Sequence, residues 1–243
     1  DYFKTFLMLA FKDTVIGHNS PLFSTKDINI ERGNFYSLIG RNGIGKTSLF
    51  ESILGNIQVL AGDIFLNDHS ISSLSQADRA KIIAFVPSKF NGVQHLTGEQ
   101  YISLGRAPYT NFIGKLSDTD KNLVKEIIER LKVEHLTLKD TSKMSDGERQ
   151  ILSVARAIVQ EAPIILLDEP SAFLDYPNRV KILNLLQSLA HEKNLCIVQS
   201  SHDLDLCLDY SDHFLVFQNE QLLLKSNKIG LSKETLLKIA FDI

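Results

Sequence analysis

Short, continuous runs of apolar residues are separated along most of the chain by stretches with helical periodicity. The clearest runs are "FYSLIG" (35–40), "IIAFVP" (82–87), "PIILLD" (163–168) and "LCIVQS" (195–200). Continuous rather than alternating hydrophobicity is typical of parallel strands that are covered on both faces. The pattern therefore predicts buried strands at these four places.

Two stretches between or beyond these runs repeat their apolar residues with the spacing of a helix. One follows Ser117, an N-cap residue with Asp120 three positions later, and it carries Leu123, Ile127 and Leu131 at intervals of four. The other is traced by Ile182, Leu185, Leu186 and Leu189. Because strands alternate with helices, the sequence predicts an α/β fold with a parallel sheet.

One part of the chain departs from this alternation. Residues 88–162 have helical patterns without a convincing strand, which predicts a helical subdomain inserted into the sheet domain. The expected organisation is a core sheet domain formed by residues 1–87 and 163–243, with the helical subdomain 88–162 between them. Near the C-terminus, "HFLVFQNEQLLLK" predicts a hairpin that turns at Asn219-Glu220.

Composition and charge argue against several classes of protein. The net charge of -3 over 243 residues gives no basic footprint of the kind that many nucleic-acid-binding proteins carry. No stretch approaches the roughly 18 consecutive apolar residues that a membrane span requires. Cys196 and Cys207 lack the spacing of metal ligands, so we expect reduced thiols in the core of a cytosolic protein.

A glycine-rich motif supplies the first candidate chemistry. The segment "GRNGIGKTS" (40–48) has the form G-x-x-x-x-G-K-[ST], and it lies between the predicted strand "FYSLI" and a predicted helix, "SLFESIL". Its glycines let backbone N–H groups approach phosphate oxygens without obstruction. We expect Lys46 to bridge the β- and γ-phosphates and Thr47 to hold Mg²⁺. The motif thus predicts a nucleoside triphosphate site formed by Gly40, Asn42, Gly43, Gly45, Lys46, Thr47 and Ser48.

Polar residues also follow the last two predicted strands. Asp168 and Glu169 come directly after "IILL", at the carboxyl end of a strand, where open α/β sheets bind ligands. We expect Asp168 to be the Mg²⁺ partner and Glu169 to polarise an attacking water. His202, in "VQSSHD", is a candidate hydrogen-bond donor to the γ-phosphate, although a single histidine after a strand is also compatible with a structural role.

A further candidate anion site lies in "KMSDGERQ" (143–150). Ser145 and Gly147 precede "ILSVARAIVQ", which has the pattern of a helix. The N-terminus of a helix offers free N–H groups and the positive end of its dipole. No glycine-rich loop of this chain lies nearby in sequence, so the residues alone leave the identity of the anion open.

In their order, these motifs resemble those of the nucleotide-binding domain of ATP-binding-cassette (ABC) transporters. The matching segments are the phosphate loop, "MSDGERQ", "IILLDEP", "SAFLD" and "SHD". The resemblance covers essentially the whole chain and implies a P-loop NTPase (RecA-like) core with a small N-terminal antiparallel β part. It also implies that ATP and Mg²⁺ are bound between two head-to-tail copies. Ser145 and Gly147 of one copy would hold the γ-phosphate at the other, and Asp175 would reach across the same interface.

Three places depart from the family's pattern. The signature is usually Leu-Ser-Gly-Gly-Gln, whereas this chain has Met-Ser-Asp-Gly-Glu at residues 144–148. Since Asp146 adds a carboxylate near the phosphates, we expect it to point away from them or toward a cation. Ser88 stands where the family usually has a Gln that touches Mg²⁺ and reports the nucleotide state to the permease. Its hydroxyl can contact a metal-bound water but is shorter than an amide, so Ser88 is the candidate Mg²⁺ contact at this position. His18, in "VIGHNSPLF", stands where an aromatic residue stacks on adenine, and imidazole stacks more weakly than Tyr.

A shorter similarity concerns the kind of transporter. The segment "LGRAPYT" (104–110), followed by "SDTD", is similar to the ATPases of iron-siderophore, haem and cobalamin importers. It implies a peripheral subunit at the cytoplasmic face of the cell (inner) membrane, with a separate integral-membrane permease and, indirectly, a substrate-binding protein as partners. The candidate docking surface for a permease helix is 88–110, with Phe90, Val93 and Leu96, which are equally compatible with positions in the core.

Two other functions fit the same motifs. A soluble ABC ATPase that acts on nucleic acid or ribosomes typically carries two cassettes or a long coiled coil between the phosphate loop and the signature, and this sequence has neither. An exporter half normally has its membrane domain fused to the cassette. The sequence therefore favours the ATPase subunit of an importer.

Overall fold

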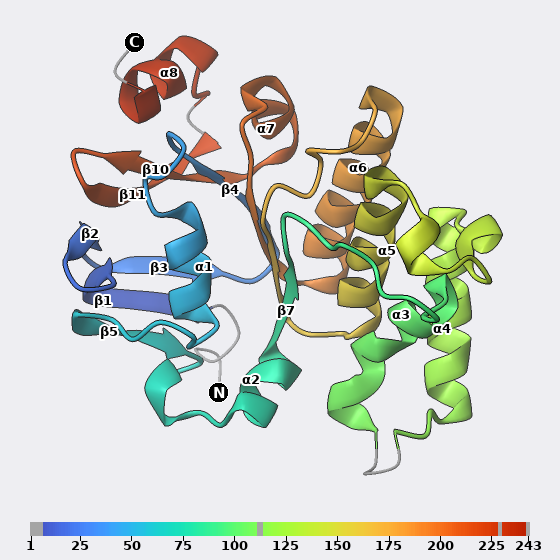
Figure 1. The fold of residues 1–243 in the computed structure, drawn as a ribbon. Helices are drawn as coiled ribbons and strands as arrows, with labels where there is room; N and C mark the ends of the chain where they lie inside the picture. The colour runs from blue at the N-terminus through green and yellow to red at the C-terminus, as the bar shows by residue number, and fades with distance from the viewer. Residues whose placement is uncertain (1–6, 111–113, 228–229, 242–243) are drawn as a thin grey trace. The chain divides into compact units, whose positions relative to one another are not determined.

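The computed structural model describes residues 7–110, 114–227 and 230–241. It divides the chain into two compact units, the first formed by residues 1–79 and 183–243 and the second by residues 80–182 (Figure 1). The domain boundaries expected from the sequence, after residues 87 and 162, stay a prediction, because contacts define compact units rather than functional domains. None of the helices in the described part of the chain has the length and apolar character needed to cross a membrane.

The first unit contains an antiparallel group of strands near the N-terminus. These strands are β1 (Leu7–Gly17), β2 (Pro21–Thr25), β3 (Ile28–Glu31), β5 (Ala61–Leu66) and β6 (His69–Ser70). Strand β1 pairs antiparallel with β2, β3 and β5, and β5 pairs with β6. This group is the small antiparallel part that the resemblance implied.

A parallel group of strands completes the sheet of the first unit. Strand β4 (Asn34–Ile39) pairs in parallel with both β9 (Cys196–Ser200) and β10 (His213–Gln218). Every residue of β9 and all but the first of β4 are buried, as the continuous hydrophobicity of their sequences predicted. The predicted buried strands are therefore confirmed here.

The predicted hairpin near the C-terminus is also confirmed. Strand β10 pairs antiparallel with β11 (Gln221–Ser226). The two residues between them, Asn219 and Glu220, both have positive φ values, 48° and 58°. Two consecutive left-handed residues are the conformation that a two-residue type I′ hairpin requires. Strand β11 then meets β2 in parallel at Gln221 and Ser24, which joins the parallel and antiparallel groups.

Helices cover the sheet of the first unit. They are α1 (Lys46–Ile53), α7 (Leu204–Tyr210) and α8 (Lys233–Phe241), with η1 (Ile71–Ser73), the start of α2 (Gln76–Ile82) and the part of α6 (Tyr176–Lys193) from residue 183 on. Helix α8 packs on the sheet through Leu236 and Ala240, which join a buried cluster with Phe214 and Val216 of β10. Both cysteines are free thiols buried in this unit, as expected.

The second unit combines two parallel strands with a group of helices. Strand β7 (Ile83–Val86) pairs in parallel with β8 (Ile164–Leu167). The helices are α3 (Gly98–Ser103), η2 (Leu104–Tyr109), α4 (Asp118–Leu131), η3 (Glu134–Leu136), η4 (Thr141–Lys143), α5 (Asp146–Val159) and the first part of α6 (Tyr176–Lys193). Helix α5 packs against α3, α4 and β7 (Figure 1). The described residues between 88 and 162 are helical apart from loops and one isolated bridge, Thr97–Asp140.

Helix α4 begins where the sequence predicted. Ser117 Oγ accepts a hydrogen bond from Asp120 N at 3.1 Å, and the Asp120 carboxylate accepts one from Ser117 N at 2.9 Å. This reciprocal arrangement is a capping box, which satisfies two of the N–H groups at the start of the helix. Ile127 and Leu131 are buried, as their periodicity indicated.

A buried arginine ties several segments of the second unit together. Arg106, in η2, is only 8% exposed. Its Nε donates to Asp120 Oδ1 at 2.7 Å, and its Nη1 donates to Val159 O at 2.7 Å and Glu161 Oε2 at 2.8 Å. The guanidinium carbon also lies 4.4 Å from the ring centroid of Tyr109. One side chain thus joins η2, the start of α4 and the end of α5.

Candidate functional site

The glycine-rich loop lies between β4 and α1 and is built on residues with left-handed backbone conformations. Gly43 has a φ of 78° and Gly45 a φ of 116°. A Cβ atom added at Gly45 would lie 2.8 Å from the ring of Phe23. Gly45 is therefore required both by its backbone conformation and by the close approach of an aromatic side chain.

The N-terminus of α1 has the features of an anion site. Its N-cap, Gly45, makes no side-chain hydrogen bond to the helix, and the first turn contains no acidic residue. The positive end of the helix dipole is therefore not offset locally. Lys46 is 7% exposed, and its Nζ donates to Gly40 O at 2.8 Å and Arg41 O at 3.2 Å. Thr47 and Asn42 are exposed. The loop thus presents a cation, a hydroxyl and backbone N–H groups in one place.

His202 follows β9 at the edge of the sheet where the glycine-rich loop follows β4. Strands β4 and β9 are parallel, with Leu38 opposite Ser200, and Ser201 N donates to Leu38 O at 3.3 Å. His202 follows immediately and is exposed. The structure therefore brings two of the sequence-predicted elements, the loop and the histidine, to one end of neighbouring strands.

His18 lies in the same unit, in the turn between β1 and β2. Its side chain is exposed. The turn is tight, since a Cβ atom added at the preceding Gly17 would lie 2.0 Å from Ser20 O. Exposure leaves the imidazole accessible to a planar ligand, and its role in adenine stacking stays a prediction.

The two acidic residues after β8 are held at the carboxyl end of that strand. Asp168 N donates to Val86 O of β7 at 2.9 Å, and Asp168 is 6% exposed. Glu169 is half-buried and has a φ of 49°, a left-handed conformation that is costly for a residue with a side chain. Ser88, which follows β7, is exposed. The chain thus turns sharply just where the sequence placed its candidate metal partner and general base.

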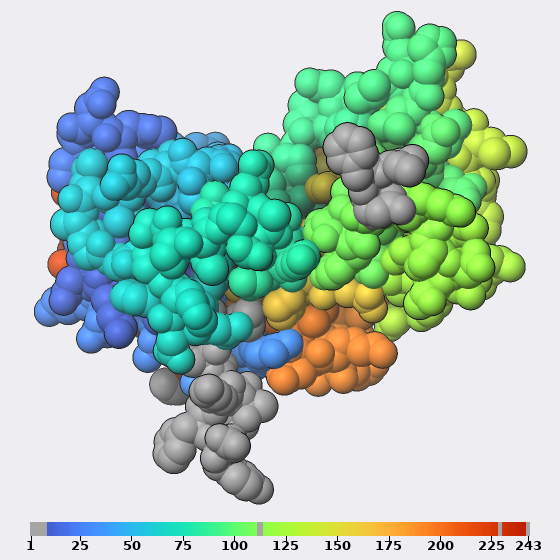
Figure 2. Space-filling view, turned by 90° about the horizontal axis from the view of Figure 1, so that it is seen from below, coloured from blue at the N-terminus to red at the C-terminus, as the bar shows by residue number. Residues whose placement is uncertain are grey.

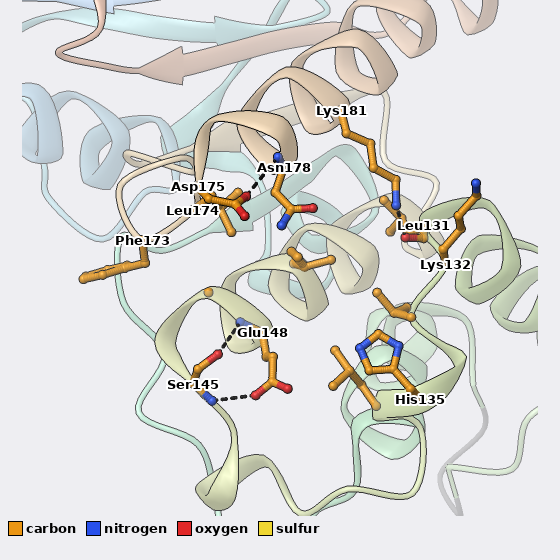
Figure 3. Close-up of a pocket in the computed structure, with 14 residues that line it drawn as sticks. Leu131, Lys132, His135, Ser145, Glu148, Phe173, Leu174, Asp175, Asn178 and Lys181 are labelled. Atoms are coloured by element: carbon orange, nitrogen blue, oxygen red, sulfur yellow. Dashed lines mark hydrogen bonds between the residues drawn. The ribbon is translucent and has the colours of Figure 1, made fainter.

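The signature segment forms the start of α5 (Figure 3). Ser145 Oγ accepts a hydrogen bond from Glu148 N at 3.2 Å, and Glu148 Oε2 accepts one from Ser145 N at 2.7 Å. Because Oγ is the acceptor in this capping box, its own hydrogen is available to donate to an anion.

Each acidic side chain of this turn faces a cation. Asp146 Oδ1 lies 2.5 Å from Arg149 Nη2, which confirms the expectation that Asp146 points toward a cation. Both oxygens of Glu148 accept from Lys139 Nζ, at 2.9 and 2.8 Å. The hydrogen bond from Arg149 lowers the pKa of Asp146, and that from Lys139 lowers the pKa of Glu148. Both carboxylates are therefore ionised and paired near neutral pH.

The signature turn also packs closely on the loop that precedes α6. A Cβ atom added at Gly147 would lie 3.0 Å from Phe173 O. A cavity of about 390 Å³ lies beside this contact, lined by the end of α4, the start of α5 and the loop 173–175 (Figure 3). Asp175 Oδ1 accepts from Asn178 N at 3.1 Å and so caps α6 within its own chain. Its expected reach across a dimer interface stays a prediction.

Each unit, taken by itself, carries an oxygen donor of the kind that binds Mg²⁺. Hydroxyl and carboxylate oxygens, as in Thr47 and Asp168, are the ligands that Mg²⁺ prefers, with phosphate oxygens and water completing its shell. In the part of the chain that the structure describes, no group of three or more His, Cys, Asp or Glu side chains could hold a metal ion. The individual roles of these residues stay predictions.

Sequence reasoning missed three features of the site. The capping box at Ser145 could have been found, because S-x-x-E before an apolar run is its sequence pattern. The pairing of Lys139 with Glu148 has no such pattern, since the two residues are nine positions apart, with Lys139 before η4 and Glu148 in α5. Phe23 beside Gly45 is likewise a contact between segments distant in sequence.

Comparison with known proteins gives consistent results. The family model described as "ABC transporter" matches residues 23–172. An uncharacterised ABC transporter ATP-binding protein from Methanocaldococcus jannaschii is 32% identical over 237 residues, which cover 97% of this chain and 82% of that protein. The achromobactin transport ATP-binding protein CbrD from Dickeya dadantii is 29% identical over 236 residues, covering 97% of this chain and 88% of that protein. The iron(3+)-hydroxamate import ATP-binding protein FhuC from Bacillus subtilis is 29% identical over 217 residues, covering 89% and 81%.

Solved structures give the same fold. A putative metal-chelate type ABC transporter in an inward-facing conformation superposes with a TM-score of 0.80 at 24% identity, covering 96% of this chain and 88% of that chain. A dimeric ATP-binding cassette bound to ADP and phosphate superposes with a TM-score of 0.79 at 22% identity, covering 90% and 98%. The predicted α/β fold of a P-loop NTPase is confirmed by these likenesses.

Proposed function

Because this chain belongs to the ABC transporter family, we propose that it is the ATPase subunit of an importer that takes up an iron-siderophore, haem or cobalamin-type cargo. Two copies would bind two ATP molecules in a head-to-tail dimer, and hydrolysis would drive a separate permease. The observation that carries the proposal is the presence, in one chain, of a glycine-rich loop at the start of α1 and, at the start of α5, a Ser145 hydroxyl that accepts from Glu148 N and keeps its own hydrogen to donate. The loop at α1 is sufficient to hold the phosphates of a nucleotide bound to the same chain. The turn at α5 is therefore suited to the nucleotide bound by a second copy.

The chemistry follows from the residues of the site. Lys46 and the N–H groups of α1 would hold the phosphates, while Thr47 and Asp168 would ligate Mg²⁺. Bound there, the ion would neutralise charge that develops on the β- and γ-phosphates. Glu169 would accept a proton from the attacking water, and His202 would orient the γ-phosphate. Ser145 and Gly147 of the other copy would close the site, with Asp175 crossing the same interface.

Cargo and membrane partner are inferred from relatives of known role and from the surface. Names of two relatives specify achromobactin transport and hydroxamate import, which supports the iron-siderophore class. A subunit of this kind works as a peripheral protein at the cytoplasmic face of the cell membrane, bound to an integral-membrane permease and, through it, to a substrate-binding protein.

The segment after β7, green in Figure 2, supplies a surface for that permease. Val93 is 51% exposed, whereas Phe90 stacks on Tyr101 with ring centroids 4.1 Å apart and belongs to the packing of the unit. Leu96 lines an apolar groove of about 600 Å³ together with Leu104, which is 51% exposed, and Leu138, which is 84% exposed. Exposed apolar side chains around a groove fit a docked helix. The expected docking surface therefore extends from Val93 to this groove.

The decisive experiment is purification of a tagged chain from detergent-solubilised native membranes. We expect a many-helix permease to elute with it, and the identity of that permease would direct the tests of cargo. Recovery from the soluble fraction alone, with ribosomes or nucleic acid and without a permease, would instead support a soluble ABC ATPase and contradict the importer.

Nucleotide selectivity gives a separate prediction about His18. Because imidazole offers a smaller stacking face than Tyr, we expect GTP and ATP to bind with comparable affinity, within about threefold. Replacing His18 by Tyr should strengthen ATP binding. Equilibrium titration of both nucleotides against both variants provides the measurement. Strong selectivity for ATP in the unaltered chain would contradict the prediction.

A further inference from the structure

We propose that Lys139 is a positioning residue for the partner's nucleotide, because it neutralises Glu148 at the turn that receives the γ-phosphate. The inference rests on the proposed function, in which Ser145 and Gly147 contact ATP bound by a second copy. Lys139 itself would not touch the nucleotide. It would act through Glu148, whose carboxylate lies in the first turn of α5.

Two carboxylates at the start of α5 would repel an anion, and each of them is paired with a cation. The N-terminus of a helix attracts anions through its dipole and its N–H groups. Helix α5 nevertheless begins with two carboxylates, Asp146 and Glu148, in that first turn. Unpaired, they would repel an incoming triphosphate. Each is instead matched by a cation within hydrogen-bond distance, Arg149 at 2.5 Å and Lys139 at 2.8 Å.

Lys139 and Arg149 lie on different segments of the chain. Arg149 lies on α5 itself, three residues from its partner, and its Nη1 also donates to Met144 O. Lys139 belongs to the irregular segment before the signature, and its own carbonyl accepts from Gly98 N of α3 at 3.1 Å. The backbone of Lys139 is thus held by the helical subdomain while its side chain holds the signature turn.

The pairing also fixes the geometry of Ser145. Both oxygens of Glu148 accept from Lys139, and Oε2 accepts in addition from Ser145 N at 2.7 Å. Glu148 N in turn donates to Ser145 Oγ at 3.2 Å, which leaves the hydroxyl hydrogen to be donated elsewhere. Lys139 therefore offsets the charge of the turn and holds the carboxylate that accepts from the backbone N–H of Ser145.

The test compares Lys139→Met with Lys139→Met/Glu148→Gln in the full-length chain. We expect Lys139→Met to raise the KM for ATP hydrolysis about 3- to 20-fold, the range for a charge placed at a helix terminus. Equilibrium binding of ATP to the dilute monomer, which uses the chain's own phosphate loop, should be unchanged. Adding Glu148→Gln removes the uncompensated charge and should restore the KM. Lys121→Met is the matched control, because Lys121 forms an exposed ion pair with Asp118 at 2.9 Å on α4 and should not affect the KM.

The alternatives give different results. If the ion pair only stabilises the fold, the double variant will remain impaired and its thermal unfolding will shift, which overturns the inference. Ser145→Arg separates the inference from the proposed function. If Ser145→Arg abolishes hydrolysis while Lys139→Met changes nothing, the positioning role is wrong and the dimer site stands. If neither variant affects hydrolysis, the proposed site at the signature is wrong as well.

Discussion

Replacement of Glu169 by Gln should leave a chain that binds ATP and forms a stable dimer but hydrolyses ATP at least about 100-fold more slowly, the contribution of a general base. Glutamine keeps the shape of the side chain and cannot take a proton from water. Glu169 directly follows Asp168, whose N–H is bonded to β7, and its φ of 49° turns the chain sharply at the end of β8. Phosphate release and light scattering, each with and without Mg-ATP, provide the two measurements.

The matched control is Glu126→Gln, which changes an exposed glutamate on α4 of the same unit. That variant should hydrolyse ATP at the normal rate. A Glu169→Gln chain that stays monomeric at saturating Mg-ATP and hydrolyses normally would show that Glu169 is not the general base. A chain that loses both hydrolysis and ATP binding would indicate damage to the fold instead.

Replacement of Arg106 by Met should lower the free energy of unfolding by about 2–4 kcal/mol, because it leaves a buried carboxylate without its partner. Asp120 is 8% exposed and loses its ion pair at 2.7 Å, and the carbonyl of Val159 loses a donor. The expected loss lies below that of a fully buried network because the Glu161 side chain is 58% exposed. Denaturant unfolding provides the measurement, with Lys121→Met as the control for an exposed pair.

The contribution of Arg106 to the free energy of unfolding should also depend on pH. Hydrogen bonds from Ser117 and then from Arg106 lower the pKa of Asp120 to about 2. A carboxyl whose pKa is lowered by folding stabilises the protein above its unfolded pKa, about 3.9, and loses that contribution as pH falls toward the folded value. The difference in the free energy of unfolding between the parent chain and Arg106→Met should therefore be largest at neutral pH and shrink below about pH 4. A difference that stays constant to lower pH would show that Asp120 is not the group involved.

Much of the fold could be predicted because its signals are local. The strand 35–40 was visible as a continuous apolar run and appears as β4, and the N-cap at Ser117 appears as a capping box. The hairpin at Asn219-Glu220 needs only two left-handed residues between complementary strands. Such features depend on a continuous apolar run, the spacing of helix residues and turn conformation, and each of these signals spans only a few neighbouring residues.

The parts of the candidate site that could be predicted are also those with a local sequence motif. The phosphate loop and the pair Asp168-Glu169 are sequence motifs, because backbone approach to phosphate and delivery of a carboxylate at a strand end require fixed residue types at fixed spacing. The sequence left open whether Phe90, Val93 and Leu96 belong to a docking surface or to the core. Phe90 is packed on Tyr101 whereas Val93 is exposed, and periodicity could not separate these outcomes.

The sequence by itself determined the family and the fold class, and it predicts the residues that would bind phosphate, because these depend on short motifs in a fixed order. Only the tertiary structure decided how charges are compensated. Lys139 reaches Glu148, Arg106 reaches Asp120 and Glu161, and Phe23 lies where a side chain at Gly45 would stand. These partners are separated by 9 to 55 residues. They lie on different segments, and which segments meet depends on the packing of the whole unit rather than on any local pattern.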